Sequence, residues 1–263
     1  PDRGRTGKEM SDIASIESSA IAVHDGIIVW VGPEDRLDKN ISIGPETRLY
    51  DANQCAVLPG LVECHTHLVF AGTRENEFAQ KIAGVPYMQI AAEGGGIKRT
   101  VGTTRAATED ELYQIALKRV DEALKLGITT VEIKSGYGLD FETEMKMLAV
   151  ARKLAETTPI KVVTTLLGAH EIPPGRDRND YLDEVCTRMI PYAAENKLAD
   201  FCDVFCEKGV YTVAEAERVL TTGMKHGLKP KIHADQMTCG GGAELAARVG
   251  AISADHIDYT DQT

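Results

Sequence analysis

The feature of this sequence that most limits its fold is a regular alternation of apolar, β-branched runs with helical stretches, beginning at Leu58. The apolar runs occupy residues 58–67, 128–136, 160–170, 199–209, 229–236 and 251–257. Helical periodicity marks residues 108–127, 141–156, 178–197, 213–227 and 242–250. Parallel strands need a crossover segment between them, so this alternation favours a parallel sheet. We therefore predict an α/β fold of the (β/α)8 TIM-barrel type, with about six βα units present.

The first 57 residues have a different pattern. Short β runs at residues 20–23 and 27–32 are joined by His24-Asp25-Gly26, which predicts a hairpin, and residues 48–58 predict a further strand. We therefore expect a small, partial β-sandwich-like domain at residues 1–57 and the barrel at residues 58–263. Because a closed barrel has eight strands, we expect its C-terminal strands to be missing and residues 1–263 alone to be inactive.

Composition excludes several partners. The formal net charge of −11 repels phosphate backbones and anionic lipid, so we expect neither a nucleic acid nor a membrane as partner. The sequence has no apolar run long enough to span a bilayer and no apolar segment typical of a secretory signal. Its six cysteines form no C-x-x-C pair, which favours reduced, mostly buried thiols and a cytoplasmic location.

Residues 68–107 form a long connection after the first predicted barrel strand. It contains Gly94-Gly95-Gly96, for which two interpretations stay open. The glycines are either a plain flexible connector or part of a mobile flap over a site at the strand ends. They do not form a phosphate-binding loop, because the G-x-x-x-x-G-K-[ST] pattern is absent.

The positions of the histidines indicate a functional site. Five of the seven histidines fall at the ends of predicted barrel strands: His65, His67, His170, His233 and His256. The carboxyl ends of the strands meet at one face of a barrel, where active sites lie. This clustering is difficult to assign to core packing alone.

A metal site follows from this arrangement. His65 and His67 are two residues apart on a strand, so both side chains point to the same side. With His233 they would supply three nitrogen ligands, which suits zinc or iron with an open position for water. An H-x-H pair alone is a weak signal, but its place at a strand end directly after Pro59-Gly60 strengthens it.

Several motifs carry a family resemblance over nearly the whole chain. PGLVECHTH at residues 59–67 resembles the opening signature of the amidohydrolase superfamily. Residues 65–108, VEIKSGYGLD, TTLLGAHEIPP and KIHADQ are similar, in order, to the imidazolonepropionase family of histidine degradation. The resemblance implies one zinc or iron ion per chain, held by His65, His67, His233 and a late aspartate for which the sequence offers no candidate. It also implies a homodimer.

The same resemblance implies roles for further residues. Arg74, Tyr87, Tyr137 and His170 would contact the substrate, and Gln236 and His256 would lie beside the reacting carbonyl. The implied substrate, 4-imidazolone-5-propanoate, is a small molecule with a carboxylate tail that an arginine binds in bidentate fashion. Gln236 stands where some members have Glu, which leaves the general base undefined.

The implied activity is metal-dependent hydrolysis of the ring C–N bond to give N-formimino-L-glutamate. The fourth predicted strand contains no lysine within its run, which argues against a carbamylated-lysine bridge and favours one metal. Two alternatives remain. One is another amidohydrolase, such as a nucleobase or aminotriazine deaminase, and the other is a non-catalytic ligand-binding or structural fragment.

Overall fold

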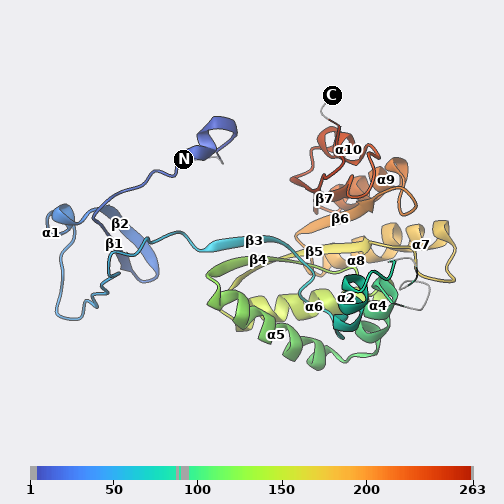
Figure 1. The fold of residues 1–263 in the computed structure, drawn as a ribbon, viewed down its shortest axis with the longest axis horizontal. Helices are drawn as coiled ribbons and strands as arrows, with labels where there is room; N and C mark the ends of the chain where they lie inside the picture. The colour runs from blue at the N-terminus through green and yellow to red at the C-terminus, as the bar shows by residue number, and fades with distance from the viewer. Residues whose placement is uncertain (1–4, 87–88, 90–94, 262–263) are drawn as a thin grey trace. The chain divides into compact units, whose positions relative to one another are not determined.

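The computed structural model describes residues 5–86, 89 and 95–261. The chain divides into two compact units, Pro1–Pro59 and Gly60–Thr263 (Figure 1).

The first unit contains the predicted hairpin. Strands β1 (Ser19–His24) and β2 (Ile27–Pro33) pair antiparallel. Asp25 and Gly26 connect them with φ angles of 49° and 77°, the two left-handed residues that a tight hairpin turn needs. The remaining elements are short: η1 (Gly7–Ser11), η2 (Glu34–Arg36) and α1 (Leu37–Asn40).

The strand predicted at residues 48–58 is wrong. The structure gives these residues no strand; they are exposed, and they turn at Asn53, whose N–H donates to Asp51 Oδ1 at 2.7 Å. A β-prone sequence becomes a strand only when another strand supplies its hydrogen bonds. Within the described residues the small sheet has only two strands, β1 and β2.

The second unit has the predicted barrel-type fold. Six parallel strands lie in the order of the sequence (Figure 1): β3 (Leu61–Thr66), β4 (Ile128–Lys134), β5 (Lys161–Ala169), β6 (Phe201–Cys206), β7 (Lys229–Ala234) and β8 (Ser253–His256). Each corresponds to one predicted apolar run. The strand order and the helical crossovers are those of a TIM-type barrel, with six strands described.

Helices connect these strands. The five predicted helical stretches are present as α5 (Glu109–Lys125), α6 (Phe141–Thr157), α7 to α8 (Arg178–Glu184 and Ile190–Glu195), α9 (Val213–Lys225) and α10 (Gly242–Val249). A π-helical turn, η3 (Val185–Met189), joins α7 to α8. Residues 68–107, expected to be a long connection, contain α2 (Glu75–Ile82) and α4 (Ile97–Ala106). Gly94 lies outside the described residues, so the choice between a connector and a flap at Gly94-Gly95-Gly96 stays open.

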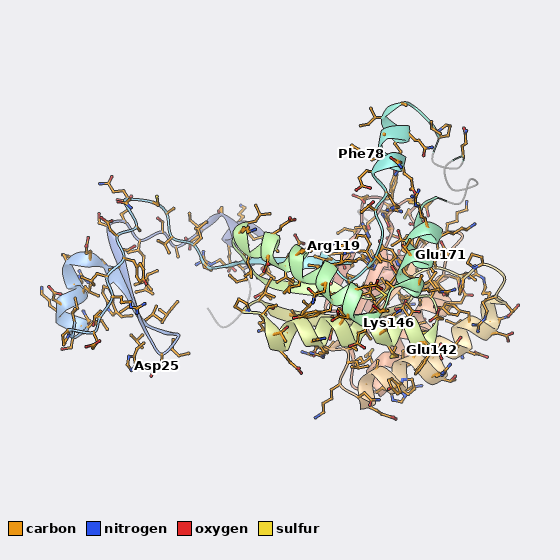
Figure 2. All side chains as sticks on the ribbon, turned by 90° about the horizontal axis from the view of Figure 1, so that it is seen from below. Asp25, Phe78, Arg119, Glu142, Lys146 and Glu171 are labelled. Carbon is orange, nitrogen blue, oxygen red and sulfur yellow. The ribbon has the colours of Figure 1, made fainter. Side chains whose placement is uncertain are left out.

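Local sequence fixes where these helices begin. Thr108 with Glu111 and Thr212 with Glu215 form capping boxes at α5 and α9. Asp140 accepts a hydrogen bond from the Thr143 N–H at the start of α6. Helices α5 and α6 pack side by side along the sheet (Figure 2).

Strands β4 and β7 separate apolar from charged side chains. On β4, Val131 and Ile133 belong to an apolar cluster with the helices, while Glu132 and Lys134 alternate with them and point to the other face. Strand β7 repeats the pattern, with Ile232 in the core. Charged residues within buried strands need partners, so this second face is where the site forms.

The cysteines agree only in part with expectation. All six are free thiols, but Cys55, Cys64 and Cys239 are exposed, so the prediction of mostly buried thiols is wrong for half of them. Within the described residues, no helix is both long and apolar enough to cross a membrane.

Candidate metal centre

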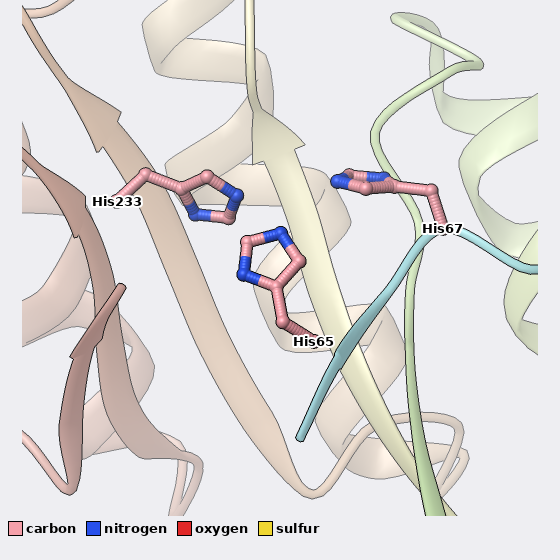
Figure 3. Close-up of side chains that lie close together, drawn as sticks. All are labelled: His65, His67 and His233. Atoms are coloured by element: carbon pink, nitrogen blue, oxygen red, sulfur yellow. The ribbon is translucent and has the colours of Figure 1, made fainter. Parts of the chain in front are cut away.

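Three histidines from two strands come together at one end of the sheet (Figure 3). His65 lies on β3 with His67 one residue past its end, and His233 lies on β7. One side-chain nitrogen from each lies within 4.8 Å of the other two. The His65 ring centroid is 4.6 Å from that of His233 and 5.6 Å from that of His67.

A polar contact of each Nδ1 atom fixes the orientation of these rings. Nδ1 of His65 lies 2.9 Å from Asp255 Oδ2, Nδ1 of His67 lies 3.0 Å from the Ser135 carbonyl oxygen, and Nδ1 of His233 lies 3.1 Å from Asp203 Oδ1. Carbonyl and carboxylate oxygens are acceptors, so each Nδ1 carries the proton. Each Nε2 therefore has a free lone pair, the form in which histidine binds a metal.

One of these nitrogens is a direct test of whether a metal fits. His233 Nε2 is buried and has no hydrogen-bond partner among the described residues. A buried polar atom without a partner costs about 1–3 kcal/mol. A metal ion bound by His65, His67 and His233 would satisfy this atom, and three neutral imidazoles are a suitable donor set for zinc or iron.

Two further predicted histidines border this cluster. The His170 ring stacks on His67, with centroids 4.9 Å apart and an interplanar angle of 11°. His170 Nδ1 donates to the Gly136 carbonyl oxygen at 2.9 Å. The His256 ring lies 5.3 Å from His65 and 5.2 Å from His233. All five strand-end histidines thus gather in one place.

Burial lowers the pKa of three of these imidazoles, those of His67, His170 and His256. It lowers the pKa of His170 to about 4, aided by the neighbouring His233. Burial together with His170 and His233 holds the pKa of His67 well below its usual value. Burial and the nearby His233 also lower the pKa of His256. Neutral rings are the protonation state that metal binding requires.

Arg74 and Tyr137 line a cavity of about 300 Å³ next to the histidines. Arg74 precedes α2, and its exposed side chain shares this cavity with Phe70 and Arg119. The Tyr137 ring lies 4.7 Å from His67 and so connects the cavity with the cluster. Arg119 stacks over Phe70 at 3.7 Å and donates to the carbonyl oxygens of Leu68 and Phe70, which fixes the cavity wall.

For the other two predicted site residues, Gln236 and Tyr87, the structure gives less information about a role. Gln236 is half-buried in the loop that follows β7, three residues after His233. Tyr87 lies outside the described residues.

A group of buried charges beneath the histidines was not foreseen from the sequence. Lys134 Nζ lies 2.9 Å from Glu132 Oε1, 2.8 Å from Asp203 Oδ2 and 2.9 Å from Asp255 Oδ2. Lys231 Nζ lies 2.5 Å from Glu132 Oε2. One feature of the sequence could have indicated this group: charged residues stand in the middle of apolar strands. A charged side chain that is buried in this way needs a partner of opposite charge.

This network is charged. Burial would lower the pKa of Lys134, but Asp203, Glu132 and Asp255 outweigh it and raise the pKa above its usual value. Burial would likewise raise the pKa of Asp203, but His233 and Lys134 hold it well below its usual value. Asp203, His233 and Asp255 also have ligand geometry, but the Lys134 ammonium lies against both carboxylates, so an internal ion pair accounts for this group.

Several solved structures have a similar fold. An N-isopropylammelide isopropylaminohydrolase from Burkholderia multivorans matches 87% of this chain and 52% of its own, with a TM-score of 0.58 and 16% identity. An amidohydrolase from Burkholderia ambifaria with bound zinc matches 75% of this chain and 64% of its own, with a TM-score of 0.51 and 14% identity. At these levels of identity the likeness shows the fold alone, which is a TIM-type barrel.

Curated relatives define the family more closely. The imidazolonepropionase of Geobacillus thermodenitrificans is 49% identical over 254 residues, which cover 95% of this chain and 60% of the relative. The chain spans about 60% of the length of the curated relatives it matches. No family model matches the chain. Over the part that it spans, the chain is 48–49% identical to proteins named imidazolonepropionase, in agreement with the resemblance found in the motifs.

Proposed function

We propose that this protein hydrolyses the ring C–N bond of 4-imidazolone-5-propanoate to give N-formimino-L-glutamate, in histidine degradation. One observation carries the proposal: three histidines present free Nε2 atoms to a common point, beside a cavity that contains an arginine. Identity of 48–49% to proteins named imidazolonepropionase supports the choice of substrate.

The metal is one zinc or iron ion per chain, held by His65, His67 and His233. When bound, such an ion would lower the pKa of a water molecule and so supply a nucleophile at neutral pH. The buried, unpartnered His233 Nε2 supports this ligand set.

The cavity at Arg74 binds the carboxylate tail. Its guanidinium offers paired N–H donors to the propanoate, and Tyr137 places a flat ring between this cavity and His67. Tyr87 is assigned to the same substrate on the family resemblance alone. His170, fixed by the Gly136 carbonyl, keeps its Nε2 directed away from that bond and contacts the substrate ring.

His256 polarises the reacting carbonyl, and Gln236 lies beside it. His256 ends β8 with a left-handed φ of 74°, and its ring is within 5.3 Å of His65. A donor at this position stabilises the negative charge that develops on the carbonyl oxygen. Gln236 has no titratable group, so it orients the substrate by hydrogen bonding and does not act as the base.

A deaminase of nucleobases or aminotriazines is the competing enzyme. The similar deaminase-type structures share 14–18% identity with the chain, a level that supports the fold alone. Arg74 in the substrate cavity favours a substrate that carries a carboxylate. A non-catalytic fragment would have no need for four histidines whose Nδ1 protons are all fixed.

Three parts of the proposal rest mainly on the sequence. These are a cytoplasmic location, a homodimer, and a barrel domain that begins at residue 58 after a small β domain. Size-exclusion chromatography with light scattering tests the homodimer directly.

The test of function is an assay of ring opening. The protein is loaded with zinc or with iron and mixed with 4-imidazolone-5-propanoate, and N-formimino-L-glutamate is measured by mass spectrometry. We expect product with at least one metal and none after chelation. Release of ammonia from a nucleobase or aminotriazine, without ring opening of the imidazolone, would favour the deaminase instead.

A further inference from the structure

Lys134 occupies an unusual position. It lies on β4 with its side chain fully buried, 0% exposed, and its ammonium contacts carboxylates from three strands: Glu132 on β4, Asp203 on β6 and Asp255 on β8. A buried ammonium is tolerated only with excellent pairing. Three carboxylates within 2.9 Å provide that pairing.

Two of these carboxylates are bonded to candidate metal ligands. Asp203 accepts from Nδ1 of His233 at 3.1 Å, and Asp255 lies 2.9 Å from Nδ1 of His65. Each aspartate therefore lies between one histidine and the same ammonium. Rotation of either carboxylate away from its histidine would break its contact with Lys134.

We propose that Lys134 is a positioning residue of the metal centre. Through Asp203 and Asp255 it holds His233 and His65 as Nδ1–H tautomers whose Nε2 atoms face one metal ion. The inference rests on the metal site of the proposed function and adds to it a residue that contacts neither metal nor substrate. Partners beyond the ligands themselves commonly tune metal affinity.

A purely structural role is the competing explanation, in which Lys134 only neutralises buried acids. The chain offers a matched control in Lys231, a second buried lysine that contacts the same Glu132. Lys231 Nζ also donates to the Cys64 carbonyl oxygen at 3.4 Å. Among the described residues its ion pair is with Glu132 and with neither aspartate, so its loss removes a buried charge and leaves both Asp–His pairs intact.

The experiment compares Lys134→Met with Lys231→Met in the protein. Zinc affinity is measured by competition with a chelating dye, the ligand field by the visible spectrum of the cobalt(II) form, and stability by urea unfolding of the metal-free protein. We expect Lys134→Met to weaken zinc binding about 10- to 100-fold and to shift the cobalt bands. Lys231→Met should lose stability but keep the wild-type affinity and spectrum.

The outcomes separate the two proposals. Equal effects of the two substitutions on zinc affinity and cobalt spectrum would overturn the role of Lys134 while leaving the metal site intact. A wild-type protein that binds no zinc would remove the metal site itself. If Lys134→Met does not fold, Lys134→Gln is measured in the same way, since its amide is neutral but polar. Wild-type zinc affinity in that variant also overturns the inference.

Discussion

Asp235 provides a quantitative test of how the chain builds the loop after β7. Its side chain is 2% exposed and accepts N–H groups from Gly240 at 2.9 Å, Gly242 at 3.1 Å and Ala243 at 3.2 Å. These residues lead into α10, whose N-cap residue, Gly241, has no side chain to cap the helix. A carboxylate from the preceding strand end thus performs the capping.

The substitution Asp235→Asn changes one acceptor into a donor and little else. Asp235 has a φ of 50°, which asparagine also tolerates. The amide oxygen can still accept the hydrogen bonds from the N–H groups of Gly240 and Gly242, but the NH₂ group then faces the Ala243 N–H. One orphaned donor costs about 1–3 kcal/mol. The lost negative charge at a helix start adds about 0.3–1 kcal/mol.

We therefore expect Asp235→Asn to be less stable by about 1–4 kcal/mol, or roughly 3–15 °C in melting temperature for a unit of this size. The assay is thermal and urea unfolding of the metal-free protein, followed by circular dichroism. Glu244→Gln is the control, because it removes a charge from the exposed first turn of the same helix. If the two variants unfold alike, the capping argument is refuted.

The same variant has a defined pH dependence. Burial would raise the pKa of Asp235, but the N–H groups of Gly240, Ala243 and Gly242 outweigh it and lower the pKa below its usual 3.8. The unfolded chain then binds the proton more tightly than the native state. The stabilisation that the Asp235 carboxylate provides is therefore complete above the usual pKa of 3.8, and it is lost as the pH falls through the lower pKa of the native state. The difference between wild type and Asp235→Asn should therefore narrow in acid, and a constant gap would contradict this account.

The remaining predictions concern the metal and substrate. His65→Ala removes a proposed metal ligand. Loss of a residue that only hydrogen-bonds to a ligand typically reduces metal affinity about 10- to 100-fold, so His65→Ala should reduce zinc affinity by more than this, as metal analysis would show. Arg74→Ala should raise KM about 10- to 150-fold through loss of a charge-assisted hydrogen bond, whereas the exposed Arg99→Ala should not. His256→Ala should lower kcat about 100-fold or more while metal content stays constant; loss of metal would instead make His256 a ligand.

Much of the barrel could be predicted because its strands and helices have clear periodicities. All six apolar runs became strands, and the Thr108–Glu111 pair caps a helix at the expected place. The helix Ile97–Ala106 was missed because its sequence, IKRTVGTTRA, is rich in threonine and contains glycine, both poor helix formers. Its stability comes from tertiary contacts, such as the Thr103 hydroxyl that donates to the Ala71 carbonyl oxygen at 2.7 Å.

The candidate site, too, could be predicted only in part, because some of its contacts depend on the folded structure. The strand-end rule brought His65, His67 and His233 together from sequence alone, because parallel strands end at a common face. The contacts of Lys134 with Asp203 and Asp255 could not be derived in this way. They join residues 69 and 121 positions apart, and only the tilt and register of the folded strands decide which charged side chains meet.

The sequential order of the six strands has a consequence for how the chain acquires its fold. Every strand from β4 onward finds its pairing edge on the strand formed just before it, across one intervening crossover. Apart from the long connection between β3 and β4, such pairings close shorter loops than a pairing with a more distant strand would, and shorter loops cost less entropy. A chain emerging from the ribosome can therefore add one strand and its helix at a time, in the order of synthesis. The histidine cluster forms later, because His65 on β3 can contact His233 only after the next four strands, β4 to β7, have formed.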